Sequence, residues 1–310
     1  MTFDEFVKRF STEEQCREYL FQLRWPNGFI CPRCNGKDYR IISDKLYWCI
    51  NCKYKASVTA GTIFQDTRSS LKTWFTVIWW ITTQKYGASA EGLQQVLGLG
   101  SYETAWTWLH KIRKAMVFAD RTKLSGVVEV DETYIGGVEH SESTGRGTGN
   151  KVLVAVAVEL KDKPNKKGIH PLGRVRLSVI KDASADSLLP FIINNIDSGS
   201  EVITDGWSGY ASLSNNGYKH TVNVQSKKQI DEKILPHVHL IISLLKRWLL
   251  GTHQGAASSK HMQAYLEEYT FRFNRRNSDK RGLLFHRLLE GAVNCAPFTY
   301  DELVTLPENS

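Results

Sequence analysis

Four cysteines arranged in two short pairs constrain the start of this chain more than any other feature. They form the segments CPRC and CINC, with Cys31 and Cys34 in the first pair and Cys49 and Cys52 in the second. Fourteen residues separate the pairs, a spacing typical of a ribbon in which four thiolates hold one tetrahedral zinc ion. We therefore predict a structural zinc site that takes the place of a large hydrophobic core in so small a unit.

A redox-active CxxC motif is the alternative interpretation of each pair. Two copies are present and no thioredoxin-like pattern surrounds them, which favours the metal site. Basic and aromatic residues around the pairs resemble a nucleic-acid surface, with a solvated charged face as the alternative. They are Arg24, Arg33, Lys37, Arg40, Lys45, Lys53 and Lys55, together with Tyr39, Tyr47 and Trp48.

Composition and length bound the class of protein. The chain has 310 residues, 42% of them hydrophobic, which allows a sizeable core and more than one module. Lysine and arginine outnumber aspartate and glutamate by 40 to 32, a balance that suits a polyanionic partner without requiring one. The start, MTFDEFVKRF, lacks the apolar run of a signal peptide, and the most apolar stretch, Trp74 to Thr82, is too short to span a bilayer. We expect a cytoplasmic protein with no membrane partner, whose cysteines stay reduced.

The middle of the chain has a helical pattern. Between Ser69 and Met116, aromatic and aliphatic residues recur at steps of three and four. The segment SAEGLQQVLGLGS predicts a short helix and a glycine-bearing turn, and the helix after it carries Lys111, Arg113 and Lys114. This order resembles a helix-turn-helix, so we expect these three cations to contact DNA. A helical linker whose tryptophans pack against the next domain is the alternative.

After Lys123 the sequence changes to apolar runs of strand length. GVVEVDETYIGG, KVLVAVAVEL and GRVRLSVI predict an antiparallel meander, and residues 185–195 predict a helix. SEVITD then predicts a strand, SGYASLSN a helix, KHTVNV a short strand, and the segment from about Pro236 a last long helix. This is the element order of a ribonuclease H-like α/β domain. We accordingly assign residues 1–60 to a zinc-ribbon domain with a short N-terminal helix, 61–122 to a helix-turn-helix-like module, 123–295 to the α/β domain and 296–310 to a tail.

Three side chains fall where a nuclease of this fold needs metal ligands. We expect Asp131 in the first strand, Asp205 at the end of the fourth strand beside it, and His239 on the last helix. Two divalent ions about 3.5 to 4 Å apart can activate an attacking oxygen and stabilise a leaving one. Carboxylates suit Mg²⁺ or Mn²⁺, whereas an imidazole suits them less, so His239 either binds a metal weakly, orients a water or transfers a proton.

The last helix is expected to divide into two sides. His239, Ser243 and Lys246 form one stripe, and Lys246 is expected to touch a DNA phosphate. The other side is expected to be apolar and consists of Leu240, Ile241, Leu244, Leu245 and Trp248. Glu129 and Glu132 flank Asp131, and we expect both to point to the opposite face of the sheet.

The proposed ligands also have plain structural interpretations. Asp131 and Asp205 could simply form turns at strand ends, and His239 could be a first-turn histidine without a ligand role. The nearby competitors for a ligand role are His237, His253, Asp231 and Glu232.

Together these segments resemble the insertion-sequence 1595 family, the zinc-ribbon transposases of bacterial insertion sequences. The resemblance runs from about Phe3 to Leu289 and rests on the cysteine pairs and on SAEGLQQVLGLGSYETAWTWLHKIRKAM, VEVDETYIGG, ITDGWSGY, HVHLIISLLKRWLLGTHQG and YLEEYTFRFNRR. It implies a DDE-type catalytic domain whose first two acidic residues are Asp131 and Asp205. The usual third residue is a glutamate seven positions before a lysine or arginine. Here His239 stands seven before Lys246, and similar members of the family also replace the glutamate by asparagine or histidine.

The resemblance also implies a reaction and its partners. Water would cleave the phosphodiester at each element end, and the freed 3′-hydroxyl would attack target DNA. The cofactors would be structural zinc and two catalytic ions, Mg²⁺ or Mn²⁺. The partners would be the terminal inverted repeats, the target DNA and further copies of the chain assembled on DNA, in association with the bacterial nucleoid. In the segment RFNRR, Arg275 and Arg276 would grip phosphates, with a solvated helix end as the alternative.

Two other functions stay open on the sequence. A zinc-ribbon and helix-turn-helix regulator, or an inactivated transposase copy, would bind the same DNA without cutting it. A ribonuclease H-like nuclease or resolvase would cleave DNA by its structure without joining ends.

Overall fold

The computed structural model describes residues 1–43, 45–84, 86–117, 121–136, 151–161, 171–224, 234–253, 259–278 and 281–305. The chain forms two compact units, one made of Met1–Phe118 and Ser278–Thr305 and the other built mainly from Ala119–Asn277. The chain thus returns to the first unit after passing through the second. Residues 278–295, which the sequence boundaries place with the α/β domain, therefore group with the helical unit.

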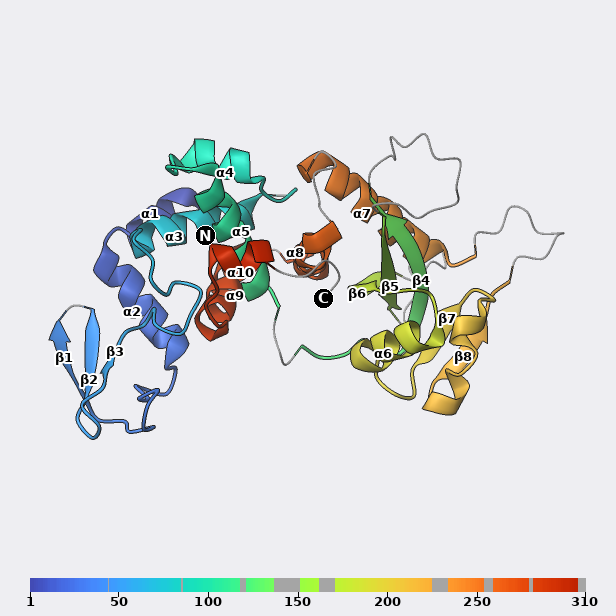
Figure 1. Ribbon diagram of the computed structural model, residues 1–310, viewed down its shortest axis with the longest axis horizontal. Helices are drawn as coiled ribbons and strands as arrows, with labels where there is room; N and C mark the ends of the chain where they lie inside the picture. The colour runs from blue at the N-terminus through green and yellow to red at the C-terminus, as the bar shows by residue number, and fades with distance from the viewer. Residues whose placement is uncertain are drawn as a thin grey trace. The chain divides into compact units, whose positions relative to one another are not determined.

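The first unit begins with two helices and a small sheet. Helices α1 (Phe3–Arg9) and α2 (Glu13–Arg24) each start with a capping box, in which Thr2 and Thr12 accept backbone N–H groups. The strands β1 (Tyr39–Ser43), β2 (Leu46–Cys49) and β3 (Lys55–Ala56) follow, antiparallel and in that order (Figure 1).

Aromatic rings join α2 to this sheet. The ring centroids of Phe21 and Trp25 lie 4.8 and 5.7 Å from that of Tyr47, and Phe29 and Tyr39 complete the cluster. Tyr47 is buried, so its ring does not belong to a nucleic-acid surface as the sequence suggested. The ribbon consequently has a small aromatic core in addition to its cysteines.

A helical bundle completes the first unit. It contains α3 (Leu71–Thr83), α4 (Ala90–Leu97), α5 (Tyr102–Ala115), α9 (Arg281–Asn294) and α10 (Tyr300–Thr305). Helix α4 ends at Gly98, whose φ of 62° is the left-handed conformation common at helix ends, and the side chain of Ser101 caps α5. Helix α4 packs against α5, which gives the expected succession of short helix, turn and longer helix. Trp74 and Trp108 stack inside this unit with centroids 3.8 Å apart.

Helix α9 explains why the end of the chain belongs to this unit. It contacts α2, α3 and α5. Its Phe285 is 2% exposed and lies 5.7, 5.5 and 5.6 Å, between ring centroids, from Phe6, Phe10 and Phe75. Without α9, these aromatic residues of the N-terminal segment would face water.

The second unit contains a five-stranded mixed sheet in the order β6-β5-β4-β7-β8. Strands β4 (Val127–Ile135), β5 (Val152–Leu160) and β6 (Leu172–Ile180) form the predicted antiparallel meander. Strands β7 (Glu201–Thr204) and β8 (Lys219–Val222) continue the sheet parallel to β4. Strand β4 therefore lies at the centre, with an antiparallel neighbour on one side and a parallel neighbour on the other.

Helices cover both faces of this sheet (Figure 1). Helix α6 (Ala185–Asn195) packs on the face to which Val128 and Val130 point. Helices α7 (Pro236–His253) and α8 (Met262–Asn274) pack on the other face, against alternate residues of β5 such as Val154 and Val156. Strand β5 is thus apolar on both faces, as expected for a strand buried between helical layers.

Two sequence-based expectations for this unit are wrong. The segment SGYASLSN forms two short 3₁₀ turns, η1 (Ser208–Tyr210) and η2 (Ser214–Asn216), because its serine, glycine and asparagine residues are poor helix formers. Leu240 is 47% exposed, so it does not belong to the buried side of α7. At 100° per residue it shares a stripe with the exposed residues Ser243 and Arg247.

Within the described parts of the chain, every helix is too short or too polar to cross a membrane.

Replacing Phe285 by alanine tests the place of α9. We expect the Phe285→Ala variant to lose about 3–5 kcal/mol in the free energy of unfolding of the first unit, because a large cavity opens among three aromatic rings. Leu283→Ala is the matched control, since Leu283 is 46% exposed on the same helix. Urea unfolding of both variants measures the difference, and equal stabilities would contradict the assigned packing.

Candidate metal and active-site residues

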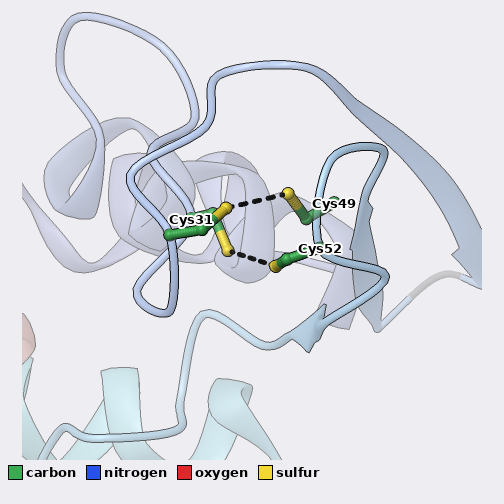
Figure 2. A group of neighbouring side chains, drawn as sticks. Cys31, Cys49 and Cys52 are labelled. Atoms are coloured by element: carbon green, nitrogen blue, oxygen red, sulfur yellow. Dashed lines mark hydrogen bonds between the residues drawn. The ribbon is translucent and has the colours of Figure 1, made fainter.

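The four paired cysteines converge on one point. The sulfurs of Cys31 and Cys52 lie 3.6 Å apart, as do those of Cys34 and Cys49, and all four lie within 4.8 Å of one another (Figure 2). A zinc ion with four sulfurs at about 2.3 Å would have sulfur–sulfur distances of about 3.8 Å. Among the residues that the structure describes, this is the one set of three or more histidine, cysteine or acidic side chains gathered closely enough for a shared ion. The quartet fits structural zinc.

The backbone adopts the same conformation at both cysteine pairs. Asn35 and Lys53, each directly after a pair, adopt φ values of 59° and 63°. Their N–H groups donate to the carbonyls of Cys31 and Cys49 at 2.9 and 3.0 Å. Each CxxC segment therefore closes into a tight turn that brings two sulfurs to the same side.

Backbone amides prepare one of these thiols for metal binding. Burial raises the pKa of Cys31, but the N–H groups of Arg33 and Cys34 and the neighbouring thiols of Cys52 and Cys34 outweigh it and lower the pKa to about 7. The thiolate is the metal-binding form of cysteine. The turn geometry thus favours the thiolate form of Cys31, which is the form that binds a metal.

The second unit brings Asp131 and His239 together. Asp131 lies on β4, and Oδ2 of its carboxylate is 3.0 Å from Nε2 of His239 in the first turn of α7. Asp205 directly follows the last residue of β7. Because β4 and β7 are parallel neighbours in a register that pairs Glu129 with Ile203, Asp131 and Asp205 reach the same end of the sheet. The two strand positions expected from the sequence are present.

The charges at this end of the sheet are poorly compensated. Burial raises the pKa of Asp131, and the negative charge of Asp205 raises it further. The N–H of Glu132, which donates to Asp131 Oδ1 at 2.9 Å, and His239 only partly offset this rise. A bound cation would relieve the repulsion between the two carboxylates.

Glu132 adds a third carboxylate from the other face of β4. The hydroxyl of the buried Tyr210 donates to its Oε2 at 2.6 Å. Burial raises the pKa of Glu132, and the charges of Asp131 and Asp205 raise it further. Glu132 therefore points away from the face of Asp131, as expected, yet contributes to the same electrostatic environment.

The expectation for Glu129 is wrong. Side chains along a strand alternate with a period of two, so Glu129 shares the face of Asp131. Its Oε1 lies 2.6 Å from Nδ1 of His237 on α7. The sequence contained a signal for this contact. Glu129 and Asp131 are two positions apart, and so are His237 and His239.

The competing ligands do not join Asp131. His237 pairs with Glu129, and the ring of His253 lies at the far end of α7 against Trp248 and Tyr265. Asp231 and Glu232 lie outside the described residues. Asp131, Asp205 and His239 stay the predicted donor set, although among the described residues their ligand atoms are not gathered as closely as the four sulfurs. Two carboxylates with one imidazole are chemically suited to Mg²⁺ or Mn²⁺.

The expected DNA-contacting cations of α5 differ in exposure. Arg113 is 2% exposed, so the expectation that it contacts DNA is wrong; the helix turns this residue into the bundle. Lys111 is partly buried, and burial lowers its pKa. Lys114 is exposed, and its ammonium lies 4.5 Å from the ring centroid of Phe298.

The cations of the second unit also divide into two kinds. The guanidinium of Arg276 stacks on Phe273 at 3.9 Å and donates to the carbonyls of Leu172 and Gly173, so it ties α8 to β6. Arg275 stacks on the ring of a neighbouring phenylalanine at 4.1 Å and is partly buried. Lys246 is exposed on α7. Of these three cations, Lys246 is the most available to a ligand.

Removing one cysteine of the quartet tests the zinc site. We expect wild-type protein to carry about one zinc ion per chain and Cys31→Ser to lose it, because three thiolates leave a tetrahedral structural site open. The α/β unit should stay folded, since it does not contain the ribbon. Cys295→Ser is the control, because Cys295 lies outside the quartet. Zinc content by atomic emission decides, and unchanged zinc in Cys31→Ser would contradict the site.

Known proteins match both parts of the chain. The model of the transposase zinc-ribbon domain matches residues 11–55, and that of the ISXO2-like transposase domain matches residues 123–274. A protein in the transposable element ISH50 of Halobacterium salinarum is 24% identical over 292 residues, which cover 86% of this chain and 92% of the relative. The cysteine quartet lies within the first matched segment, and Asp131, Asp205 and His239 lie within the second. The chain belongs to the insertion-sequence 1595 family of zinc-ribbon transposases.

Proposed function

We propose that this transposase cuts phosphodiester bonds at the ends of its insertion sequence and joins the freed 3′-hydroxyls to target DNA, in a reaction that depends on divalent metal. The observation that carries the proposal is the 3.0 Å contact between His239 and Asp131, formed beside the strand that ends at Asp205. Asp131 and His239 come from separate elements, and Asp205 directly follows the parallel strand next to that of Asp131, which supports a shared site.

The architecture of the second unit supports a ribonuclease H-like fold. An antiparallel meander of three strands is followed by two strands parallel to the first, in the order β6-β5-β4-β7-β8. This is the arrangement expected from the sequence order of strands and helices. A central strand that carries the first acidic residue, next to a parallel strand that ends in the second, suits cleavage assisted by metal ions.

The residues of the chain then have separate tasks. Asp131 and Asp205 would hold the metal ions, and His239 would complete the site as a third ligand or orient the attacking water. Bound Mg²⁺ or Mn²⁺, two ions in our proposal, supplies activation of the attacking oxygen and stabilisation of the leaving oxygen. Lys246, two helical turns beyond His239, would bind a phosphate of the DNA strand.

The ribbon presents several exposed cations that could contact DNA. Six of them surround the cysteine pairs, and the ammonium of Lys53 also lies 4.6 Å from the ring centroid of Trp48. The six are Arg33, Lys37, Arg40, Lys45, Lys53 and Lys55. Arg24 does not join them, because it donates to the carbonyls of Ser57 and Val58, each at 2.9 Å. We infer that phosphate contacts of the ribbon, supplemented by Lys111, Lys114 and Arg275, hold the terminal inverted repeats.

Cutting and joining two ends in one complex would require at least two copies of the chain on DNA. We infer such an assembly, located with the bacterial nucleoid, from the reaction proposed for this transposase.

Substitution of the acidic pair tests the catalytic assignment. With element-end DNA and Mg²⁺ or Mn²⁺, we expect nicking and strand transfer in the wild type and a loss of about 10³-fold or more in Asp205→Ala. His239→Ala should also lose activity if the imidazole completes the site. Asp186→Ala is the control, because Asp186 is an exposed carboxylate in the first turn of α6.

The outcomes separate the rival functions. A wild-type chain that binds the ends and cuts with neither metal would be a regulator or an inactivated copy. Cutting without any joining would instead indicate a nuclease or resolvase. Full activity of Asp205→Ala would disprove the proposed site.

The phosphate contact of Lys246 has a separate signature. We expect Lys246→Ala to weaken DNA binding and to make the slope of log affinity against log salt shallower by about 0.9, the value for one duplex phosphate contact. Lys219→Ala is the control, because its ammonium lies 2.7 Å from the carboxylate of Glu201. Fluorescence anisotropy at several salt concentrations measures the slopes, and an unchanged slope in Lys246→Ala would exclude the contact.

A further inference from the structure

The first turn of α7 has no polar side chain of its own to cap it. The residue before the helix is Leu235, which has a φ of 51°, and the first helical residue is Pro236, which has no N–H. The N–H of His239 donates to the carbonyl of Leu235 at 3.2 Å. The N–H groups of His237 and Val238 remain and need acceptors, as at the start of any helix.

Glu129 of β4 supplies these acceptors. Its Oε2 accepts the N–H groups of His237 and Val238, both at 2.9 Å, and its Oε1 contacts Nδ1 of His237 at 2.6 Å. Glu129 is 3% exposed. A buried carboxylate is costly unless it is hydrogen-bonded, and here three hydrogen bonds and the positive end of the helix stabilise it. The carboxylate thus acts as a cap that comes from the neighbouring sheet.

The cap and the proposed active site belong to the same pair of elements. Glu129 and Asp131 project from one face of β4, and they meet His237 and His239 of α7. Strand β4 therefore fixes the start of the helix at two places, one buried and one nearer to solvent. A shift of the first turn would break the contact at Glu129 and also move His239 away from Asp131.

We propose that Glu129 is a positioning residue of the active site, which acts by capping α7 so that His239 meets Asp131. The proposal rests on the proposed function, since positioning matters only if Asp131 and His239 take part in catalysis. Glu129 itself does not touch the reacting groups. Residues that orient metal ligands in this way commonly contribute about 10–100-fold to metal affinity or activity.

Two substitutions separate capping from general stability. Glu129→Gln can keep every bond, because its oxygen can accept both backbone N–H groups and its amide can donate to Nδ1 of a neutral His237. Glu129→Leu fills the same space and removes the cap. Glu129→Asp keeps the charge in a folded protein but shortens the side chain by one methylene, so the carboxylate no longer reaches the helix.

Glu159 provides the matched control in the same sheet. Its carboxylate accepts the N–H groups of Ser125 and Arg174 at 3.1 and 3.2 Å and pairs with the guanidinium of Arg174. Glu159→Leu therefore removes a comparable set of bonds without touching α7. It should lower stability and leave metal binding and cutting unchanged.

The experiment has two readouts on the full chain: the Mn²⁺ affinity without DNA, by titration calorimetry, and the cutting of element-end DNA. We expect Glu129→Leu and Glu129→Asp to lose about 10-fold or more in both, and Glu129→Gln to stay within about threefold of the wild type. In a His239→Ala background, Glu129→Leu should cause no further loss in cutting, because both changes remove one function.

Each outcome of this experiment either supports or overturns the positioning role of Glu129. Wild-type affinity and cutting in Glu129→Asp, or losses that add fully to those of His239→Ala, would overturn the proposal. Equal losses in Glu159→Leu would also overturn it, because they would indicate a general effect of stability. A wild-type chain that neither binds Mn²⁺ nor cuts DNA would overturn the proposed function itself. Equal cutting by the wild type and by the Glu129→Leu variant would overturn the positioning role alone.

Discussion

The packing of α7 against the central strand β4 is the constraint on which the geometry of the second unit depends. The buried side of the helix, Val238, Ile241, Leu245 and Leu249, lies on the same core as alternate residues of β5. This apolar contact sets the rotation of α7 about its axis, and the rotation decides which side chains leave the core. His239 can reach Asp131 because Val238 and Ile241 are held in the core, which leaves His239 at the edge of the contact. The hydrophobic layer and the proposed catalytic contact are therefore one arrangement.

Alternation along β4 then distributes the carboxylates. Odd-numbered residues point to α7, which places Glu129 and Asp131 there. Even-numbered residues point to the face of α6, where Glu132 meets Tyr210. Three acidic groups within four residues thus have three different partners: a helix start, a proposed metal ligand and a buried phenol. One strand provides all three because the side-chain period is two.

Sequence reasoning was reliable where a local pattern determines structure. Apolar runs predicted the meander, Pro236 predicted the start of α7, and the cysteine spacing predicted the converging sulfurs. It failed where tertiary packing decides. The amphipathic pattern of α5 does not reveal that the bundle buries Arg113, because the residues of α9 that complete the bundle come from far along the chain. The face of Glu129 was a different failure, since the period of two alone was sufficient to assign it. The hydrogen bonds between Glu129 and α7 still required the structure, because no local pattern specifies which helix start a buried carboxylate meets.

A histidine in the third position changes the electrostatics of the proposed site. Burial and Asp205 already raise the pKa of Asp131, so a glutamate at position 239 would add a third negative charge to a pair that repels. The imidazole instead forms a hydrogen bond with Asp131, which stabilises the carboxylate before any metal binds. A histidine in place of a glutamate at position 239 also leaves less negative charge to hold two divalent ions. Glu132 partly compensates, because its charge acts on the same region while Tyr210 holds it on the other face of the strand. An active site built on His239 therefore depends more on the fixed position of its ligands than on their summed charge, which is why a buried cap at the start of α7 matters to the chemistry.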